Sequence, residues 1–538
     1  MPLKFRLRRE QPQGWVLAGL LVATWVGLSG AARAQGAATA PAQTTTAQPT
    51  AAPLETLPTL RAPLTPRSLA QALTVRNLEL AYGRDSVAIG ASLAAAEAAL
   101  YEPILFASAK RTSIERQRTP EEKSANFVNQ DNKLDEDGRT LEAGVRQRLP
   151  LGGELSVSAR QAERSSNVLL KSASPTTLEV NSGLVLSFKQ PLLRGAGVGI
   201  TETDKRVSEI ESLVAQWQYL QQLHKVLAEG LSLFWQAEVA SQATRWREQL
   251  LAGTESLVQD ARVRVEAGKL APRANLELAR VMLAREADLG RAVQTRDELK
   301  LRLLSSLDLD ADQLPGLQFD GQSVAPQVAT TSIDEALAQW SPYQVAKLRK
   351  RQGELRLAFA SNQRRPAVDL VMSYTQTGLA NASRRASLGI VKEGDYPEWF
   401  VGLNIELGAF GNRKAESQMV AQARRVEQSD TEISAIRQAF LNDRQAKQMA
   451  RDQLLRETAL TKQEVQTRQA LLDDERQRFN AGLGLLGNLL QAEQDLLESR
   501  IRAADAQGRL ETARLALLLA DGTLLPAYGI DTPSPSLP

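Results

Sequence analysis

The sequence predicts an α+β protein that is internally duplicated, with long antiparallel helices joined to short amphipathic strands. Residues 199–268 and 411–482 have a helical pattern with little proline or glycine inside it, and a second helical stretch follows each closing glycine. Alternating residues, as in 183–188 and 400–406, precede each long stretch. At 1.5 Å per residue each long helix would reach roughly 100 Å, which suits a coiled coil, a tube or a spacer.

The start of the chain predicts a secretory signal peptide over residues 1–34. Basic residues precede an apolar run at 15–28, and Ala-Arg-Ala at 32–34 fits a cleavage site. An uncleaved N-terminal anchor is the alternative. Beyond this segment no apolar run reaches the ~18–20 residues of a membrane helix, so entry into a membrane would require β-strands.

Charge and cysteine content exclude several classes of protein. The whole chain has a formal net charge of +3, and the predicted signal holds most of the excess of basic residues. The mature chain is therefore close to neutral and has no basic excess for a nucleic-acid partner. Since the chain has no cysteine, it has no disulfide framework and no N-terminal cysteine for a lipid anchor.

Between a leader and a tail the chain is predicted to form two structural repeats. Residues 35–66 are rich in Ala, Thr, Pro and Gln and predict a disordered leader, and residues 527–538 predict a disordered tail. The first repeat covers 67–333 and the second 334–526. Three pairs of segments with the same plan indicate the duplication: 71–109 with 335–373, 186–211 with 403–428, and 264–283 with 478–497.

The returning helix of the second repeat has a seven-residue period. Leu489, Leu496 and Leu517 belong to one apolar row, with a row of small residues beside it. This is the a/d seam of a coiled coil, whose small residues let helices approach closely. A similar seam in the first repeat is interrupted by Arg285. An ordinary helical hairpin in a soluble bundle is the alternative.

Short alternating runs at the other end of each long helix predict strands with one apolar face. Val368, Leu370, Met372 and Tyr374 fall on one face of such a run. This alternation fits strands that face lipid on one side and water on the other. Aromatic residues near the strand ends, Trp399 among them, either form an interfacial girdle or belong to a core.

The stretch "SFKQPLLRGAG" connects one strand to the first long helix. Pro191 has no N–H to donate and biases Gln190 towards an extended conformation, so strand pairing is expected to stop there. Leu192 is expected to pack at this junction, and Gly195 to allow a bend. An ordinary strand–turn–helix connection is the alternative. The matching bend in the second repeat is predicted at Gly408 and Gly411.

These features together resemble the TolC-like outer membrane efflux protein (outer membrane factor) family. The resemblance rests on "SFKQPLLRGAG", the doubled plan, the turns "RVEAGKLAPRANLELA" and "RFNAGLGLLGNLLQAEQDLL", and the closing "LALLLADGTLL". It implies a homotrimer whose protomers each give about four strands to one twelve-stranded β-barrel in the outer membrane of a Gram-negative bacterium. The helices would continue this barrel as an antiparallel α-helical barrel that extends into the periplasm.

The resemblance also implies a function and partners. The protein would be a passive exit duct of a tripartite efflux or type I secretion system, working with a periplasmic adaptor (membrane fusion) protein and an inner-membrane pump. A periplasmic coiled-coil scaffold without a pore is the alternative. The substrate and the adaptor are left open by the sequence.

The two helical turns are the expected periplasmic tips. The residues predicted to contact the adaptor are Ala267, Gly268, Lys269, Ala481, Gly482 and Leu483. Alternatively, they only reverse the chain. Family members often narrow the tube with polar or acidic residues after the second turn, and the matching positions look like Asn488 and Gln491. Being uncharged, these two would narrow the passage without the cation-attracting field of carboxylate rings.

Residues 139–161 depart from the family plan. They predict two short alternating strands around Gly152 and Gly153. Either they form an extra hairpin beside or above the barrel, or they add strands to the barrel. The short faces, rich in Ala, Arg and Gln, favour the extra hairpin.

The sequence offers little for catalysis or for binding a cofactor. His224 is the only histidine, so with no cysteine a zinc site or a nucleophile–histidine pair has almost nothing to build on. Acidic runs such as residues 473–475 are predicted to be solvated helix faces. We see no P-loop type phosphate-binding motif. The sequence therefore predicts no enzyme, no cofactor and no metal, and energy for transport would come from a partner.

Overall fold

The computed structural model describes residues 63–124, 132–167, 178–268, 270–321, 331–408, 411–531 and 534–536. The predicted signal peptide (1–34) and nearly all of the predicted leader (35–66) lie outside these residues. The described residues belong to one unit of the chain.

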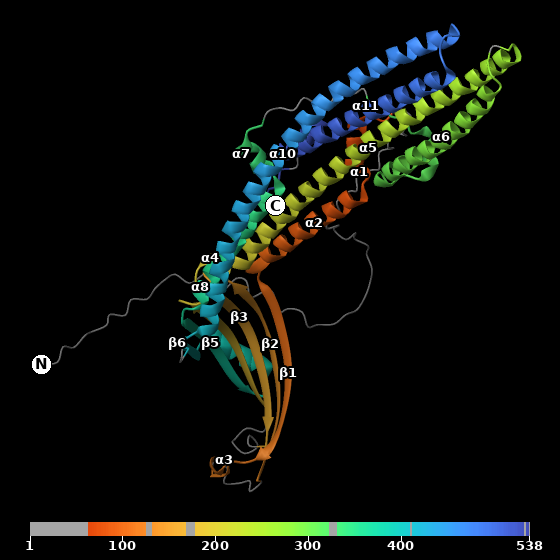
Figure 1. Cartoon of the computed structure of the whole chain (residues 1–538). Coiled ribbons are helices and arrows are strands. Elements are labelled where there is room, and N and C mark those ends of the chain that lie inside the picture. The colour runs from red at the N-terminus through yellow and green to blue at the C-terminus, as the bar shows by residue number, and fades with distance from the viewer. Residues whose placement is uncertain are drawn as a thin grey trace, which may run out of the picture. The chain divides into compact units, whose positions relative to one another are not determined.

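Two very long helices dominate the two halves of the chain. Helix α5 (Thr203–Glu266) has 64 residues and α10 (Arg413–Asn480) has 68, so each is roughly 100 Å long. After a glycine turn, α6 (Arg273–Ser306) runs back along α5, and α11 (Leu486–Ala520) runs back along α10 (Figure 1). Since α11 also packs on α5, the two helical hairpins lie side by side. The long antiparallel helices expected from the sequence are present.

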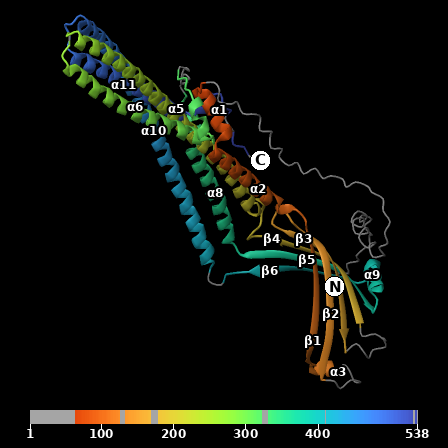
Figure 2. The ribbon, with the colours of Figure 1, turned by 90° about the vertical axis from the view of Figure 1, so that its right-hand side faces the viewer.

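Shorter helices pack around the long ones. Helix α2 (Leu78–Ala98) packs on α5, and α8 (Ser341–Gln363) packs on both α5 and α10 (Figure 2). Asn77 caps α2, and Asn412 caps α10. The remaining short elements are α1 (Pro66–Arg76), η1 (Ala99–Tyr101), α3 (Pro120–Ser124), α4 (Val198–Thr201), η3 (Ala311–Gly316), α7 (Ile333–Gln339), α9 (Arg384–Glu393) and α12 (Leu524–Ala527).

The strands of the described chain form one antiparallel sheet in the order β1-β2-β3-β4-β5-β6. The strands are β1 (Ile104–Gln117), β2 (Lys133–Arg148), β3 (Glu154–Ser166), β4 (Leu178–Pro191), β5 (Ala367–Asn381) and β6 (Pro397–Glu406). Strand β4 leads into α4 and α5, and β6 leads into α10, so the helices begin where the sheet ends (Figures 1 and 2). The α+β class is confirmed.

The expectation of about four strands, with residues 139–161 as an extra hairpin, is wrong for this sheet. Strands β2 and β3 lie between β1 and β4. Strand β2 pairs with β1, and β3 pairs with β4, along nearly their whole length. Charged residues of β2 and β3 pair across the ladder: within residues 139–161, Arg146 Nε lies 3.9 Å from Glu154 Oε1, and further pairs lie beyond that segment. Lys133 Nζ lies 2.8 Å from Glu115 Oε2, and Arg164 Nη2 lies 2.8 Å from Glu136 Oε2. Such cross-strand charge pairs stabilise a sheet.

The main core lies where α1, α2 and the ends of α6 and α11 meet the middle of α5. Phe234 and Leu303 are fully buried there, and Gly230 leaves room for Leu73, since a Cβ at this position would clash with the Leu73 side chain. Within the segment expected to be a loose tail, Tyr528 is buried in this core, and Ser536 hydrogen-bonds through its backbone to Gln216. A second core, which includes Leu278 and Phe479, joins the helical hairpins near their tips.

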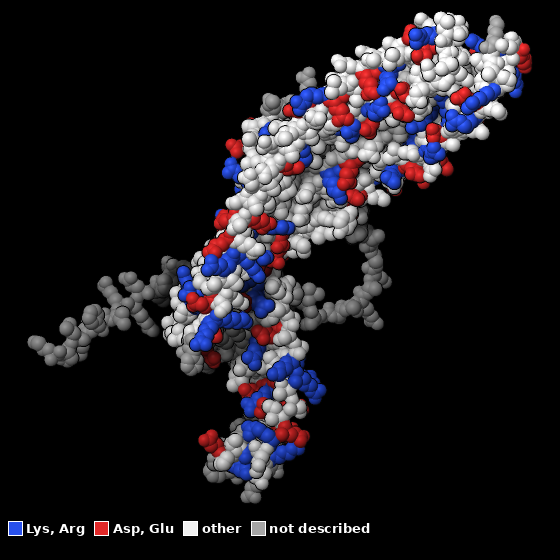
Figure 3. Space-filling model, viewed as in Figure 1, with Lys and Arg blue, Asp and Glu red and all other residues white. Residues whose placement is uncertain are grey.

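Charged side chains cover much of the helical surface. On the face shown in Figure 3, acidic and basic residues are interspersed along the helices. Over the described residues, none of the helices combines the length and the apolar composition that a membrane crossing requires.

Candidate functional site

An unbroken row of exposed apolar side chains crosses one face of the sheet. The strand registers place one residue of each strand in this row, and every one of these side chains is at least a third exposed. We call it the apolar row; its members are Leu105, Val145, Val157, Leu186, Tyr374 and Trp399. Leu105 at one edge is 80% exposed and Trp399 at the other is 73% exposed. A contiguous exposed apolar surface of this extent indicates contact with lipid or protein.

Further apolar residues widen the row on the same face. Because side chains alternate between faces along a strand, residues two positions away share the face of the row. Leu184, Met372, Val401 and Leu403 are such neighbours, and all are exposed. Around this row, the expected alternation with one apolar face is therefore present in every strand of the sheet.

The opposite face of the sheet is polar. One row on it consists of Ser108, Glu142, Arg160, Gly183 and Thr377. The sheet thus separates an apolar surface from a polar one, as a strand between lipid and water requires.

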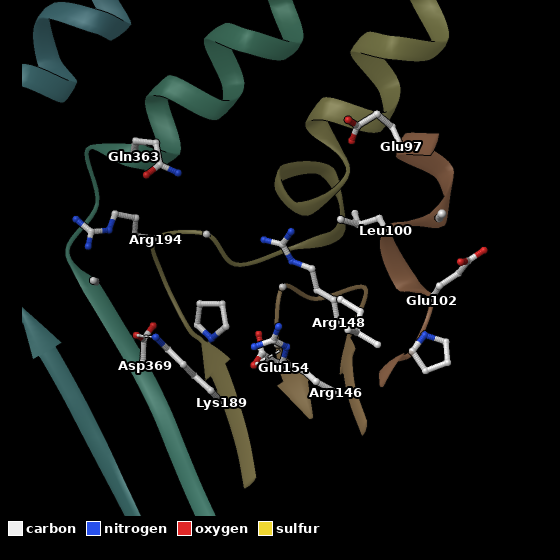
Figure 4. Close-up of a pocket in the computed structure, with 18 of the residues that line it drawn as sticks. Glu97, Leu100, Glu102, Arg146, Arg148, Glu154, Lys189, Arg194, Gln363 and Asp369 are labelled. Carbon is white, nitrogen blue, oxygen red and sulfur yellow. Dashed lines mark ion pairs between the residues drawn. The ribbon is translucent and has the colours of Figure 1, made fainter. Parts of the chain in front are cut away.

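At the helical end of the polar face lies a charged cavity of about 930 Å³ (Figure 4). Its charged lining residues are Arg146, Arg148, Lys189, Arg194, Glu97, Glu102, Glu154 and Asp369. Lys189 Nζ lies 3.0 Å from Asp369 Oδ2, and Arg146 Nε lies 3.9 Å from Glu154 Oε1. Since most of these side chains are well exposed, each pair contributes at most about 1 kcal/mol to stability. The mixed lining favours neither cations nor anions.

Of the predicted junction residues, Pro191 and Gly195 line this cavity, whereas Gly408 and Gly411 line a separate cavity of about 400 Å³. Pro191 is the last residue of β4, and the Leu192 N–H still donates to Val368 O of β5 at 2.7 Å, so pairing ends one residue after the proline. Gln190 donates from Nε2 to Leu151 O at 3.1 Å, which ties the junction to the β2–β3 turn. In the protomer the Leu192 side chain is 46% exposed and not packed as expected.

Glycines allow the chain to turn at both strand-to-helix junctions, from β4 into α4 and α5 and from β6 into α10. Gly195 has φ +82° and Gly411 has φ +76°, a region that side chains disfavour. Gly408 has no positive φ, and its carbonyl accepts from the Gly411 N–H at 3.3 Å. Both glycines therefore belong to one turn, and among its described residues Gly411 is the one with a positive φ.

Asn362, at the end of α8, holds the first junction and was not singled out from the sequence. Its Oδ1 accepts from the Gly195 N–H at 2.7 Å, and its Nδ2 donates to Leu193 O at 3.1 Å. The side chain is buried, so it satisfies two backbone groups that strand pairing leaves free. In the sequence, Asn362 is only a polar residue near the end of a helix. Such residues are too common to predict these two hydrogen bonds to the junction.

Helix α9 packs on β4 and β5, on the same face as the apolar row. The Ser387 hydroxyl donates to Gly378 O at 2.6 Å and accepts from the Ser182 N–H at 2.9 Å. Ser182 and Gly378 stand opposite each other in the two strands, so this hydroxyl bridges the ladder. Arg384 of α9 forms an ion pair with Glu163 of β3.

The two helical turns lie next to each other at the far end of the helices. Gly268 has φ +70° and Gly482 has φ +73°, as expected for glycines that end helices. The Arg264 guanidinium lies 5.1 Å from the ring centroid of Phe479, which connects the two turns. Ala481 is exposed, and Leu483 is 85% exposed. Ala267 is the C-cap of α5. Lys269 lies outside the described residues.

Asn488 and Gln491 both lie on the exposed side of α11 near the tip. Gln491 Nε2 donates to Asp495 Oδ1 at 2.7 Å. Asp495 in turn accepts from Arg468 Nη1 at 2.6 Å. The uncharged pair therefore has a carboxylate one turn away, whose charge is balanced by an arginine.

A buried ion pair joins the two helical hairpins. Arg285 of α6 donates from Nη1 to Glu493 Oε2 of α11 at 3.1 Å, and the same nitrogen hydrogen-bonds Thr254 of α5. Arg476 of α10 approaches the other Glu493 oxygen at 3.4 Å. The interruption of the first seam at Arg285 is thus the point where all four helices are cross-linked.

His224 lies in α5, beside a cavity of about 670 Å³ that Trp340 and Phe440 also line. Burial lowers the pKa of His224 to about 4, so the side chain is neutral at physiological pH. No group of His, Asp and Glu within the described ranges is arranged to hold a metal ion.

Comparison with known proteins agrees with this architecture. Residues 332–523 match the model of the family described as "Outer membrane efflux protein". No curated protein matches the sequence. Among solved structures, the chain is similar to the outer membrane protein VceC of Vibrio cholerae, with a TM-score of 0.61 and 14% identity over 85% of this chain and 96% of that one.

Two other solved outer membrane channels have a similar fold. The CmeC channel of Campylobacter jejuni has a TM-score of 0.63 and 10% identity, over 85% of this chain and 86% of that one. The open state of the MtrE channel of Neisseria gonorrhoeae has a TM-score of 0.58 and 15% identity, over 85% and 89%. The match over residues 332–523 to the outer membrane efflux protein family, together with a fold shared with these channels, confirms the resemblance predicted from the sequence.

Proposed function

We propose that this protein is an outer membrane channel and serves as the passive exit duct of a tripartite efflux or type I secretion system. The observation that supports this most is the sheet, which has the apolar row on one face and polar residues on the other. A pore wall in lipid needs this division, because its outer face meets hydrocarbon and its inner face meets water.

A homotrimer would complete the duct. Three sheets would close into one barrel in the outer membrane of a Gram-negative bacterium, and the helices would extend the passage into the periplasm. Helices of roughly 100 Å support this, since they are far longer than a globular core needs.

The helical tips would meet a periplasmic adaptor protein, which connects the duct to an inner-membrane pump. We propose that Ala267, Gly268, Lys269, Ala481, Gly482 and Leu483 make this contact. The exposed Leu483 supports it, because an exposed leucine at a chain reversal is available to a partner. Asn488 and Gln491 would narrow the passage nearby by bulk and hydrogen bonding. The proposal has no catalytic step, and the pump supplies the energy.

The experiment is conductance of the purified protein in planar lipid bilayers, with a matched pair of substitutions in β4. Val185 and Leu186 are neighbours that point to opposite faces, and Leu186 belongs to the apolar row. Val185→Lys should leave assembly intact and shift ion selectivity towards anions, because its side chain faces the lumen. Leu186→Lys should reduce the yield of inserted channels, since a lysine facing lipid costs about 2–4 kcal/mol at mid-membrane.

The alternative function, a scaffold without a pore, predicts different results in the same experiments. A periplasmic coiled-coil scaffold without a pore would be recovered in the soluble periplasmic fraction, would give no conductance, and would tolerate both substitutions equally. Any of these results contradicts the duct.

A further inference from the structure

Strands β2 and β3 cross the apolar row together with the other strands. Val145 and Val157 stand in the middle of the row, and they pair with each other and with the flanking strands. Leu141, four residues before Val145 on the same face of β2 and further from the helices, is also exposed. A hairpin beside or above a membrane would not continue the row, so this hairpin is part of the surface that faces lipid.

The apolar surface reaches both edges of the sheet. Leu105 lies on the edge strand β1, and Trp399, Val401 and Leu403 lie on the edge strand β6. Within the part of the chain that the structure describes, neither edge strand has a partner on its outer side. Lipid offers no hydrogen bonds, so backbone N–H and C=O groups at this level need another strand.

A second copy of the chain fits both edges. Strand β1 begins at the helical end of the sheet, and β6 returns towards that end, so β6 of one copy would run antiparallel to β1 of the next. All neighbours in the sheet are already antiparallel.

From this geometry we infer that each copy gives six strands to the membrane segment, so that three copies close an eighteen-stranded barrel instead of the expected twelve. The inference rests on the proposed trimeric duct. Barrel diameter grows roughly in proportion to strand number, so the lumen would be about 1.5 times wider. For strands ~4.8 Å apart and tilted by ~40°, the barrel radius is about 18 Å with eighteen strands and about 12 Å with twelve. Passengers too wide for a twelve-stranded segment would pass this one.

Distances between protomers test this inference directly. The chain has no cysteine, so Thr375→Cys in β5 gives one spin-label site per protomer. Pulsed electron–electron double resonance on the full chain in lipid nanodiscs gives the distance between labels, which point into the lumen because Thr375 pairs with Val185. After allowance for the inward reach of the label, the Cα atoms of this position should lie about 31 Å apart for eighteen strands and about 21 Å apart for twelve.

A hairpin deletion is the matched control. Removal of residues 133–166, with a short Gly-Ser linker in their place, leaves β1 and β4 antiparallel and four strands per copy. With the same allowance for the label, the Cα separation should then fall to about 21 Å. If this variant does not assemble, the distance in the full chain still decides.

Two results would overturn the inference in different ways. A full-length trimer with the distance of twelve strands would refute the six-strand contribution and leave the duct standing. A monomer without any dipolar distance would refute the duct and this inference together.

Discussion

At the residue scale, the buried pair of Arg285 and Glu493 determines how the two helical hairpins hold together. Both side chains are less than a tenth exposed, and they come from different halves of the chain. Removing one partner of a buried pair leaves an uncompensated charge, which is costlier than losing the pair as a whole. The sequence could not reveal this, because an arginine in an apolar seam looks like a defect until its partner 208 residues away is known.

Glu493→Gln should therefore loosen the hairpins near their tips. We expect a loss of about 3 kcal/mol in local stability, seen as roughly 100-fold faster amide hydrogen exchange in α6 and α11 around the pair. Glu498→Gln is the control, since Glu498 lies on the same helix in an exposed pair with Arg502 at 3.9 Å. Equal exchange in both variants would show that the pair does not join the hairpins.

At the element scale, α9 is held on the sheet by a serine and a glycine. The Ser387 hydroxyl bridges β4 and β5, and a Cβ on Gly378 would clash with the Ser387 carbonyl oxygen. The missing side chain at Gly378 thus allows the helix to approach the strand. Elsewhere, a glycine inside a strand weakens it, because it has no side chain to pack.

Gly378→Ala should release α9 from the sheet. The added methyl meets backbone, which cannot move aside cheaply, so we expect a cost of about 1–3 kcal/mol and proteolytic cleavage within α9. Gly402→Ala in β6 is the control, because a Cβ there meets nothing within 4 Å. Protection of α9 from proteases in the Gly378→Ala protein would contradict this account.

The elements differ in how far their sequence predicts them. The long helices were predictable, since α10 holds no glycine or proline over its full length. Strands β2 and β3 were recognised, but their place in the sheet was not, because cross-strand partners such as Glu115 for Lys133 become evident only with the register. Helix α9 gave no signal, because the one residue that it buries is a serine.

At the scale of the whole molecule, one sheet with two unlike faces continues into helices roughly 100 Å long. The charges on the helices are interspersed (Figure 3), whereas one face of the sheet has the apolar row. In the proposed duct, water would surround the helices and lipid would meet the sheet, which accounts for this contrast. The apolar row was only partly predictable from the sequence. Alternation shows which residues share a face of one strand, but only the register in the folded sheet shows which residues of neighbouring strands stand side by side.

The most direct test of this account is solvent accessibility along β4. In the cysteine-free chain, spin labels at Leu184→Cys and Leu186→Cys, reconstituted in lipid, should collide with oxygen dissolved in the bilayer. Labels at Val185→Cys and Ser187→Cys should collide with a water-soluble nickel complex. We predict a strict alternation between the two, and equal access of the nickel complex to all four positions would contradict a sheet that separates lipid from a water-filled lumen.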